Sequence, residues 1–140
     1  MGIATHPDFV KNNIIYFTQS SSVESEESGG NTALYRAVLQ DNALKDVTLL
    51  YKAKPNTKKG THFGSRIVFD NDGYLYFTIG DRGKRDENPQ DLSRDGGKVY
   101  RLMENGDIPT DNPFVFVKDA KTAVFSYGHR NPQGMTKHPI

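Results

Sequence analysis

The fold class follows from the stretch Gly60-Thr-His-Phe-Gly-Ser-Arg-Ile-Val-Phe-Asp-Asn-Asp-Gly-Tyr-Leu-Tyr-Phe-Thr-Ile-Gly-Asp81. Two apolar runs, residues 67–69 and 74–79, flank the turn Asp70-Asn-Asp-Gly73. Asp-Gly between two apolar runs is a strong signal for a β-hairpin, because glycine readily adopts the positive φ that such turns need. We therefore predict two antiparallel strands here, preceded by a glycine-flanked turn that contains His62.

Parts of this unit recur elsewhere in the chain. Tyr16-Phe-Thr18 recurs as Tyr76-Phe-Thr78 after 60 residues, and Tyr35-Arg36 recurs as Tyr100-Arg101 after 65 residues. Each period contains four short predicted strands and no convincing helix. Besides the hairpin and a strand near the N-terminus, strands are expected at residues 14–18, 33–39, 47–53, 98–103 and 122–127. Four-stranded antiparallel units in tandem are typical of β-propeller blades.

The repeat therefore predicts an all-β fold, a β-propeller of which this chain covers two blades and the first strand of a third. The blades are expected at about residues 1–54 and 62–128, and the next blade is expected to begin within 134–140. Since a closed propeller has at least four blades, we expect the chain to be a piece of one. Its outer strand edges are then unpaired, and we expect self-association through them.

Alternating strand directions sort the loops onto two faces. Residues 19–31, 54–65, 80–97 and 128–134 are expected on one face, and residues 6–13, 40–46, 70–73 and 104–121 on the other. On the first face, an offset of 68 residues places His62 opposite Arg130. Both lie in crossings between blades, near the propeller axis, where ring-shaped proteins usually hold ligands.

The composition excludes several classes of protein. The 140 residues suffice for one ordinary domain, and 18 Lys and Arg against 17 Asp and Glu leave almost no net charge. Bulk charge therefore recruits neither nucleic acid nor an anionic membrane. The absence of cysteine excludes a disulfide, a thiolate nucleophile and a Cys-ligated zinc. We find no apolar run of transmembrane length and no signal peptide, so no membrane insertion is expected.

Four motifs, in order along the whole chain, resemble the glucose/sorbosone dehydrogenase family. They are Gly2-Ile-Ala-x-His-Pro-Asp-Phe9, Arg66-Ile-Val-Phe…Asp72-Gly-Tyr-Leu-Tyr76…Gly80-Asp81, Gly97-Lys-Val-Tyr-Arg-Leu102…Gly106-Asp-Ile-Pro…Asp111-Asn-Pro-Phe114 and Tyr127-Gly-His-Arg-Asn-Pro-Gln-Gly134, the last being the most specific. The family consists of quinoprotein aldose dehydrogenases that carry pyrroloquinoline quinone (PQQ) on a six-bladed propeller. Its pattern normally continues on both sides of the part that this chain matches.

The resemblance implies roles for four residues. His62 matches the general base, which takes the proton of the anomeric hydroxyl while hydride passes from that carbon to the quinone. Arg130 matches the arginine that contacts PQQ and polarises its reacting carbonyl, and Asn131 and Gln133 match further PQQ contacts. The implied substrate is an aldose sugar, the product its lactone, and the electrons leave to an external acceptor.

The resemblance also implies calcium, but its ligands are expected outside this chain, so no metal site is predicted here. Asp70-Asn-Asp72-Gly73 lacks the later acidic ligands of a calcium loop and is interpreted as a turn. The family resemblance further implies a periplasmic or secreted location. Lys52, Lys54, Lys58 and Lys59 are interpreted as solvated lysines rather than as groups that attract an anionic cofactor.

Two departures from the family pattern leave the sugar open. His62-Phe-Gly-Ser65 stands where many relatives have His-Asn-Gly-Gly, and Thr61 stands where some glucose-oxidising relatives have an acidic residue. A lone histidine in a turn is commonly a hydrogen-bonded loop residue, and Arg130 could simply satisfy loop carbonyls. The alternative function is therefore a non-catalytic β-propeller binding segment.

Overall fold

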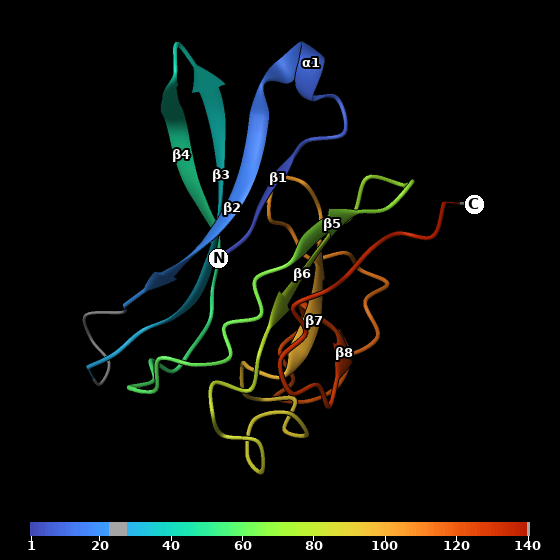
Figure 1. Cartoon of the computed structure of the whole chain (residues 1–140). Coiled ribbons are helices and arrows are strands. Elements are labelled where there is room, and N and C mark those ends of the chain that lie inside the picture. The colour runs from blue at the N-terminus through green and yellow to red at the C-terminus, as the bar shows by residue number, and fades with distance from the viewer. Residues whose placement is uncertain (23–27, 140) are drawn as a thin grey trace.

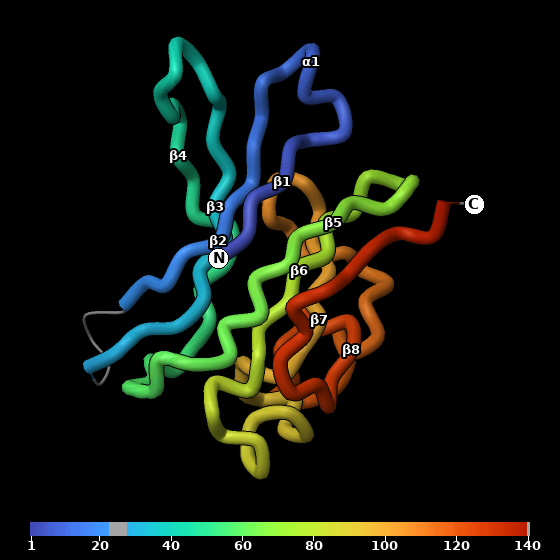
Figure 2. Tube along the Cα trace, viewed as in Figure 1, coloured from blue at the N-terminus to red at the C-terminus, as the bar shows by residue number. Residues whose placement is uncertain are grey.

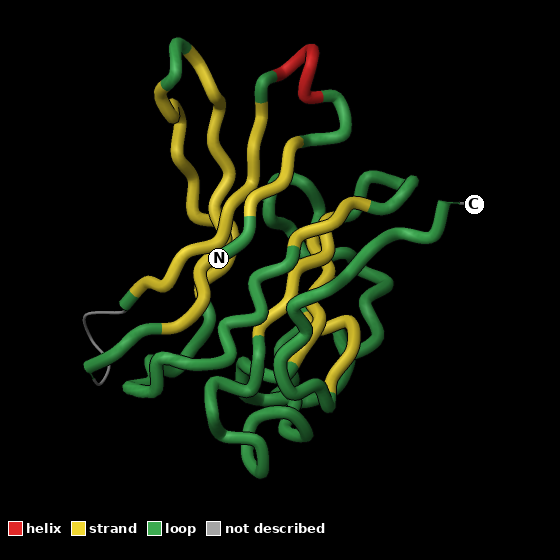
Figure 3. The backbone as a smooth tube through the Cα atoms, viewed as in Figure 1, coloured by secondary structure: helices red, strands yellow, loops and turns green. Residues whose placement is uncertain are grey.

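The structure, a computed structural model, describes residues 1–22 and 28–139, and its regular structure is almost entirely β (Figure 1). It contains two four-stranded sheets, in each of which every strand pairs antiparallel with the next along the chain. The first consists of β1 (Ile3–Thr5), β2 (Ile14–Ser21), β3 (Asn31–Gln40) and β4 (Ala43–Lys52). The second consists of β5 (Ile67–Phe69), β6 (Leu75–Ile79), β7 (Lys98–Leu102) and β8 (Val124–Tyr127). The predicted four-stranded units are confirmed, and Figure 3 shows them as two groups joined by long loops.

The predicted hairpin forms between β5 and β6. The Oδ1 atom of Asp70 accepts hydrogen bonds from the backbone N–H groups of Asp72, at 3.0 Å, and Tyr74, at 2.9 Å. Gly73 has a φ of 86°, which glycine adopts without the clash that a Cβ would cause. The side chain of Asp70 thus closes the turn, as its interpretation as a turn rather than a calcium loop predicted.

The expectation of no helix was wrong at one place. Residues Phe9–Asn12, within a segment predicted to be a loop, form the single-turn helix α1. Asn13 ends it in the left-handed conformation, with a φ of 53°, and donates its N–H to the Phe9 carbonyl at 2.8 Å. A single turn is too short to produce the apolar periodicity by which helices are recognised in a sequence.

The predicted loop 40–46 is also shorter than expected. β3 continues to Gln40 and β4 starts at Ala43, so only Asp41 and Asn42 form the connection. Both have positive φ, 51° and 58°, as a two-residue type I′ hairpin requires, and Asp and Asn tolerate this conformation better than most residues. The turn lies at the same end of the first sheet as α1 (Figure 1).

Two further predictions touch residues outside the described part. Residues 23–27 of the predicted loop 19–31 lie outside it, while the ends of that loop belong to β2 and β3. Residues 134–139 carry no strand, and Ile140 lies outside the described residues. A strand needs a hydrogen-bonded partner, so the first strand of a third blade stays a prediction.

The two sheets pack against each other around one apolar core. Tyr16 and Leu34 from the first sheet and Phe77 and Tyr100 from the second are fully buried members of it. The rings of Phe77 and Tyr100 stack with centroids 4.7 Å apart, and the ring of Tyr51 lies 5.4 Å and 5.1 Å from them. These contacts between the sheets set the relative positions of the loops at their ends.

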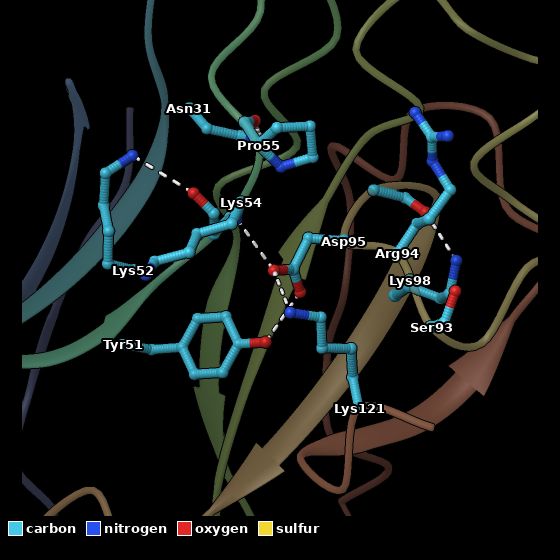
Figure 4. A network of polar contacts seen from close by, with 12 residues as sticks. Asn31, Tyr51, Lys52, Lys54, Pro55, Ser93, Arg94, Asp95, Lys98 and Lys121 are labelled. Atoms are coloured by element: carbon cyan, nitrogen blue, oxygen red, sulfur yellow. Dashed lines mark hydrogen bonds and ion pairs between the residues drawn. The ribbon is translucent and has the colours of Figure 1, made fainter. Parts of the chain in front are cut away.

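A buried carboxylate joins the same two sheets at one end of the core (Figure 4). Asp95, which is 1% exposed, accepts hydrogen bonds from the hydroxyls of Tyr51 at 2.6 Å and Tyr100 at 2.9 Å, and from the Lys54 N–H at 2.8 Å. Lys121 Nζ lies 3.6 Å from Asp95 Oδ2. Burial, reinforced by the charge of Asp95, raises the pKa of both tyrosines well above the usual value, so both hydroxyls remain donors.

The last described segment runs beside β5, as the red end of the trace in Figure 2 shows. Arg66 Nε donates to the Gln133 carbonyl at 3.0 Å, and Lys137 Nζ donates to Asn71 Oδ1 at 2.6 Å. The segment after β8 therefore crosses back over the start of the second sheet, which brings the Arg130–Gln133 turn next to the turn that contains His62.

Candidate active site

Loops from both sheets meet at the lower end of the view in Figure 1. The guanidinium of Arg82, at the end of β6, donates to the carbonyl oxygens of Gly30, at 3.3 Å, and Lys59, at 2.8 Å. The Asp81 N–H donates to the Arg130 carbonyl at 2.7 Å. The four loop regions predicted to share one face therefore do so, within the part of the chain that the structure describes.

At the centre of these loops, His62 contacts a buried carboxylate. Its Nδ1 lies 2.6 Å from Asp81 Oδ1, and the side chains of His62 and Asp81 are 27% and 1% exposed. The same Oδ1 accepts the Gly83 N–H at 2.7 Å. An ionised carboxylate only accepts hydrogen bonds, so this contact assigns the proton to Nδ1 and leaves Nε2 with a free lone pair.

The backbone around His62 is unusual and closely packed. His62 has a φ of 56° and Ser65 a φ of 81°. The left-handed region is uncommon for residues other than glycine, and such residues cluster at functional sites. A Cβ added to Gly80 would lie 2.3 Å from the His62 carbonyl oxygen and 2.7 Å from Asn131 Oδ1. Only glycine therefore allows the end of β6 to pass so close to both turns.

Phe63, which follows His62, packs against an arginine. Its ring lies under the guanidinium of Arg82, with Arg82 Cζ 3.5 Å from the ring centroid. Arg82 also donates to the Thr61 carbonyl on the other side of His62. The arginine thus holds both neighbours of His62, through a cation–π contact and a hydrogen bond.

The structure brings the predicted cofactor-binding residues to the same place. Asn131 Oδ1 accepts the Gly64 N–H at 3.1 Å, and the carbonyls of Arg130 and Gln133 are hydrogen-bonded as described above. The Arg130 guanidinium, Asn131 Nδ2 and the Gln133 side-chain amide have no hydrogen-bond partner among residues 1–22 and 28–139. Within the described residues, these three groups are therefore donors without a protein acceptor.

Sequence reasoning missed Asp81 and Arg82 as site residues. Asp81 was recognised only as part of a family motif, although a carboxylate directly after a buried strand, on the face predicted to carry His62, was a usable signal. No comparable signal existed for Arg82, because its partners lie up to 52 residues away in the sequence. Their roles depend on loops that only the packed sheets bring together.

Metal and membrane sites were searched in the same part of the chain. Among the described residues, no three His, Asp or Glu side chains are grouped so that they could hold a metal ion. The described residues also contain no helix with the length and apolar character needed to cross a membrane.

Known proteins resemble this chain over nearly its whole length. It is 36% identical over 141 residues to the aldose sugar dehydrogenase YliI of Escherichia coli, covering 99% of this chain and 37% of that protein. It is 31% identical over 163 residues to quinoprotein glucose dehydrogenase B of Acinetobacter calcoaceticus, covering 99% of this chain and 33% of that protein. The chain therefore spans about a third of the length of these relatives.

Solved structures share the fold. The apo crystal structure of the soluble aldose sugar dehydrogenase of Escherichia coli superposes with a TM-score of 0.91 at 34% identity, over 98% of this chain and 39% of that one. The PQQ-bound aldose sugar dehydrogenase of Streptomyces coelicolor gives 0.74 at 27% identity, over 94% and 36%. The two sheets thus match propeller blades of these enzymes. The Glucose / Sorbosone dehydrogenase family model matches residues 1–140, and the chain belongs to this family.

Proposed function

We propose that this chain forms the part of a PQQ-dependent aldose sugar dehydrogenase that contains the general base. The observation that carries the proposal is the 2.6 Å contact between His62 Nδ1 and Asp81 Oδ1, beside the unpartnered donors of the Arg130–Gln133 turn. This arrangement directs a basic nitrogen and a set of cationic and amide donors to one place. Oxidation of a sugar hydroxyl needs both a proton acceptor and an electron acceptor that is bound beside the sugar.

The residues present fit PQQ, a flat tricarboxylate quinone. Arg130, Asn131 and Gln133 provide N–H donors without protein partners, and carboxylate and quinone oxygens are acceptors. The planar fork of Arg130 is suited to an oxygen that gains negative charge during reaction. Bound PQQ supplies the quinone that accepts hydride from the anomeric carbon. Calcium, whose ligands are expected beyond this chain, remains part of the proposal.

The proton step is performed by His62. Its Nε2, free because Nδ1 donates to Asp81, takes the proton of the anomeric hydroxyl. The buried carboxylate of Asp81 then stabilises the imidazolium that forms, and the Gly83 N–H holds that carboxylate in place. The lactone is the product, the electrons pass to an external acceptor, and by family resemblance the enzyme acts in the periplasm or outside the cell.

The test adds PQQ and calcium to a complete propeller that contains this chain and follows both the quinone absorption and aldose oxidation. His62→Gln is expected to keep PQQ binding and to lower the rate by about 10²–10⁴-fold, the usual contribution of general acid–base catalysis. Lys45→Gln, at an exposed position of β4 outside this site, is the control and should leave the rate unchanged. A near-normal rate in His62→Gln would support the alternative, a non-catalytic binding segment.

A further inference from the structure

A pocket lies on the same face of the molecule, next to the candidate active site, and shares Arg82 with it. Its volume is about 540 Å³, and it is bounded by the segment after β4 and by the long loop between β6 and β7. Five cationic side chains line it and no carboxylate does; they are Lys58, Lys59, Arg82, Lys84 and Arg94. The sequence offered Lys58 and Lys59 only as solvated lysines, whereas the structure gathers them with three further cations.

Arg82 brings a buried positive charge without a carboxylate partner to this pocket. It is 1% exposed, and the groups to which it donates are neutral: three backbone carbonyls and the Thr57 hydroxyl. Its Nε is buried without a hydrogen-bond partner in the described part of the chain. Burial lowers the pKa of Arg82 to about 10 despite the nearby charge of Asp81. A buried cation of this kind favours an anion beside it.

The other cations are only partly neutralised. Glu87 lies 3.1 Å from Lys84 Nζ and 3.3 Å from an Arg94 nitrogen, in ion pairs with substantial exposure. Lys59 Nζ donates to the Gly83 carbonyl, and Lys58 has no polar partner among the described residues. Besides Glu87, the carboxylate of Asp81 acts on Arg82 and that of Asp91 on Arg94. Three neighbouring carboxylates therefore stand against five lining cations, and the pocket keeps a net positive charge.

A buried amide gives the pocket a rigid wall. Asn88, 1% exposed, accepts a hydrogen bond from Arg94 Nε at 2.9 Å and donates to the Asp81 carbonyl at 3.0 Å. The first bond holds the Arg94 guanidinium at the pocket. The second connects the pocket to the residue that contacts His62.

We propose that this pocket binds a small anion that carries phosphate or carboxylate groups. Guanidinium and ammonium groups recognise both anions by charge-assisted hydrogen bonds. The anion has two possible sources: an anionic substituent on the sugar substrate, or a separate small anion. The binding proposal goes beyond the proposed redox function and does not depend on it, because none of His62, Arg130, Asn131 and Gln133 lines the pocket.

The test measures binding of inorganic phosphate by calorimetry to a complete propeller containing this chain, without PQQ. Lys58→Gln/Lys84→Gln removes two cations that hold no buried contact, and it is expected to weaken phosphate binding about tenfold or more. Lys45→Gln/Lys118→Gln makes the same change of charge at exposed positions outside the pocket and should bind like the unmodified protein. No phosphate binding, or equal losses in the two double variants, would overturn the proposal.

A second arm distinguishes the sources of the anion. If the anion is part of the substrate, Lys58→Gln/Lys84→Gln should lower kcat/KM for glucose 6-phosphate and leave that for glucose unchanged. If it is a separate anion, the variant should lose phosphate binding while both sugars react as before. If the variant instead loses PQQ affinity, the pocket belongs to the cofactor and the proposal is wrong.

Discussion

Asp81→Asn probes the pairing of the imidazole with its buried carboxylate. Oδ1 of Asp81 makes both hydrogen bonds, to His62 and Gly83, whereas Oδ2 is buried without a partner among the residues that the structure describes. An asparagine is therefore expected to place its oxygen at the Oδ1 position and its NH₂ at the Oδ2 position. His62 then keeps its proton on Nδ1, and the variant removes the negative charge without changing the tautomer.

The expected size of the effect follows from this geometry. A hydrogen bond to a charged group contributes about 1.5–3 kcal/mol and one between neutral groups about 0.5–1.5 kcal/mol, so the imidazolium loses about 1–1.5 kcal/mol of stabilisation. That corresponds to a rate about tenfold lower. Asp81→Ala, which also releases the imidazole from its orientation, should lose more and approach His62→Gln.

The assay is steady-state oxidation of an aldose by a complete, PQQ-loaded propeller. In Asp81→Asn, kcat should fall and KM should change little, because the imidazolium formed during the proton transfer loses its charged partner. Asp91→Asn, an exposed carboxylate in the same loop, is the control. A near-normal kcat in Asp81→Asn, together with a large loss in Asp81→Ala, would refute a role for the charge and leave Asp81 as a residue that only orients His62.

Three further predictions follow from other residues. Arg130→Lys should lose more rate than PQQ affinity, because a point charge replaces a planar fork, and Arg130→Ala should lose both; unchanged turnover in Arg130→Ala would assign the arginine to the scaffold. Burial lowers the pKa of Lys98 from 10.5 to about 8. The unfolded chain therefore binds an extra proton between these values, and stability in thermal unfolding should rise with pH across this window but not in Lys98→Met. The 140 residues alone should self-associate through the open edges of β1 and β4 in size-exclusion chromatography; a sharp monomer peak with strong amide protection in residues 14–18 would contradict this.

The sequence by itself determined the class of the fold. Hairpin chemistry at Asp70–Gly73 and the recurrence of Tyr-Phe-Thr are local signals, and they predicted four-stranded antiparallel units that the structure confirms. Local signals were weaker where a single turn of a few residues determines the local secondary structure. The helix Phe9–Asn12 leaves no periodicity, and the Asp41-Asn42 turn lacks the glycine by which such turns are usually recognised.

The sequence also placed His62 and Arg130 on one face, because a repeat converts sequence offset into spatial register. Only the tertiary structure decided which groups act on them. Asp81 contacts His62 across 19 residues, and Arg82 reaches Gly30 across 52. Such contacts depend on how the two sheets pack. They also depend on the close approach of the turns that contain His62 and Asn131 to Gly80, where a Cβ would clash with both. Strand patterns carry no information at that scale, because they are set by backbone propensity and burial, whereas the site is set by long-range packing.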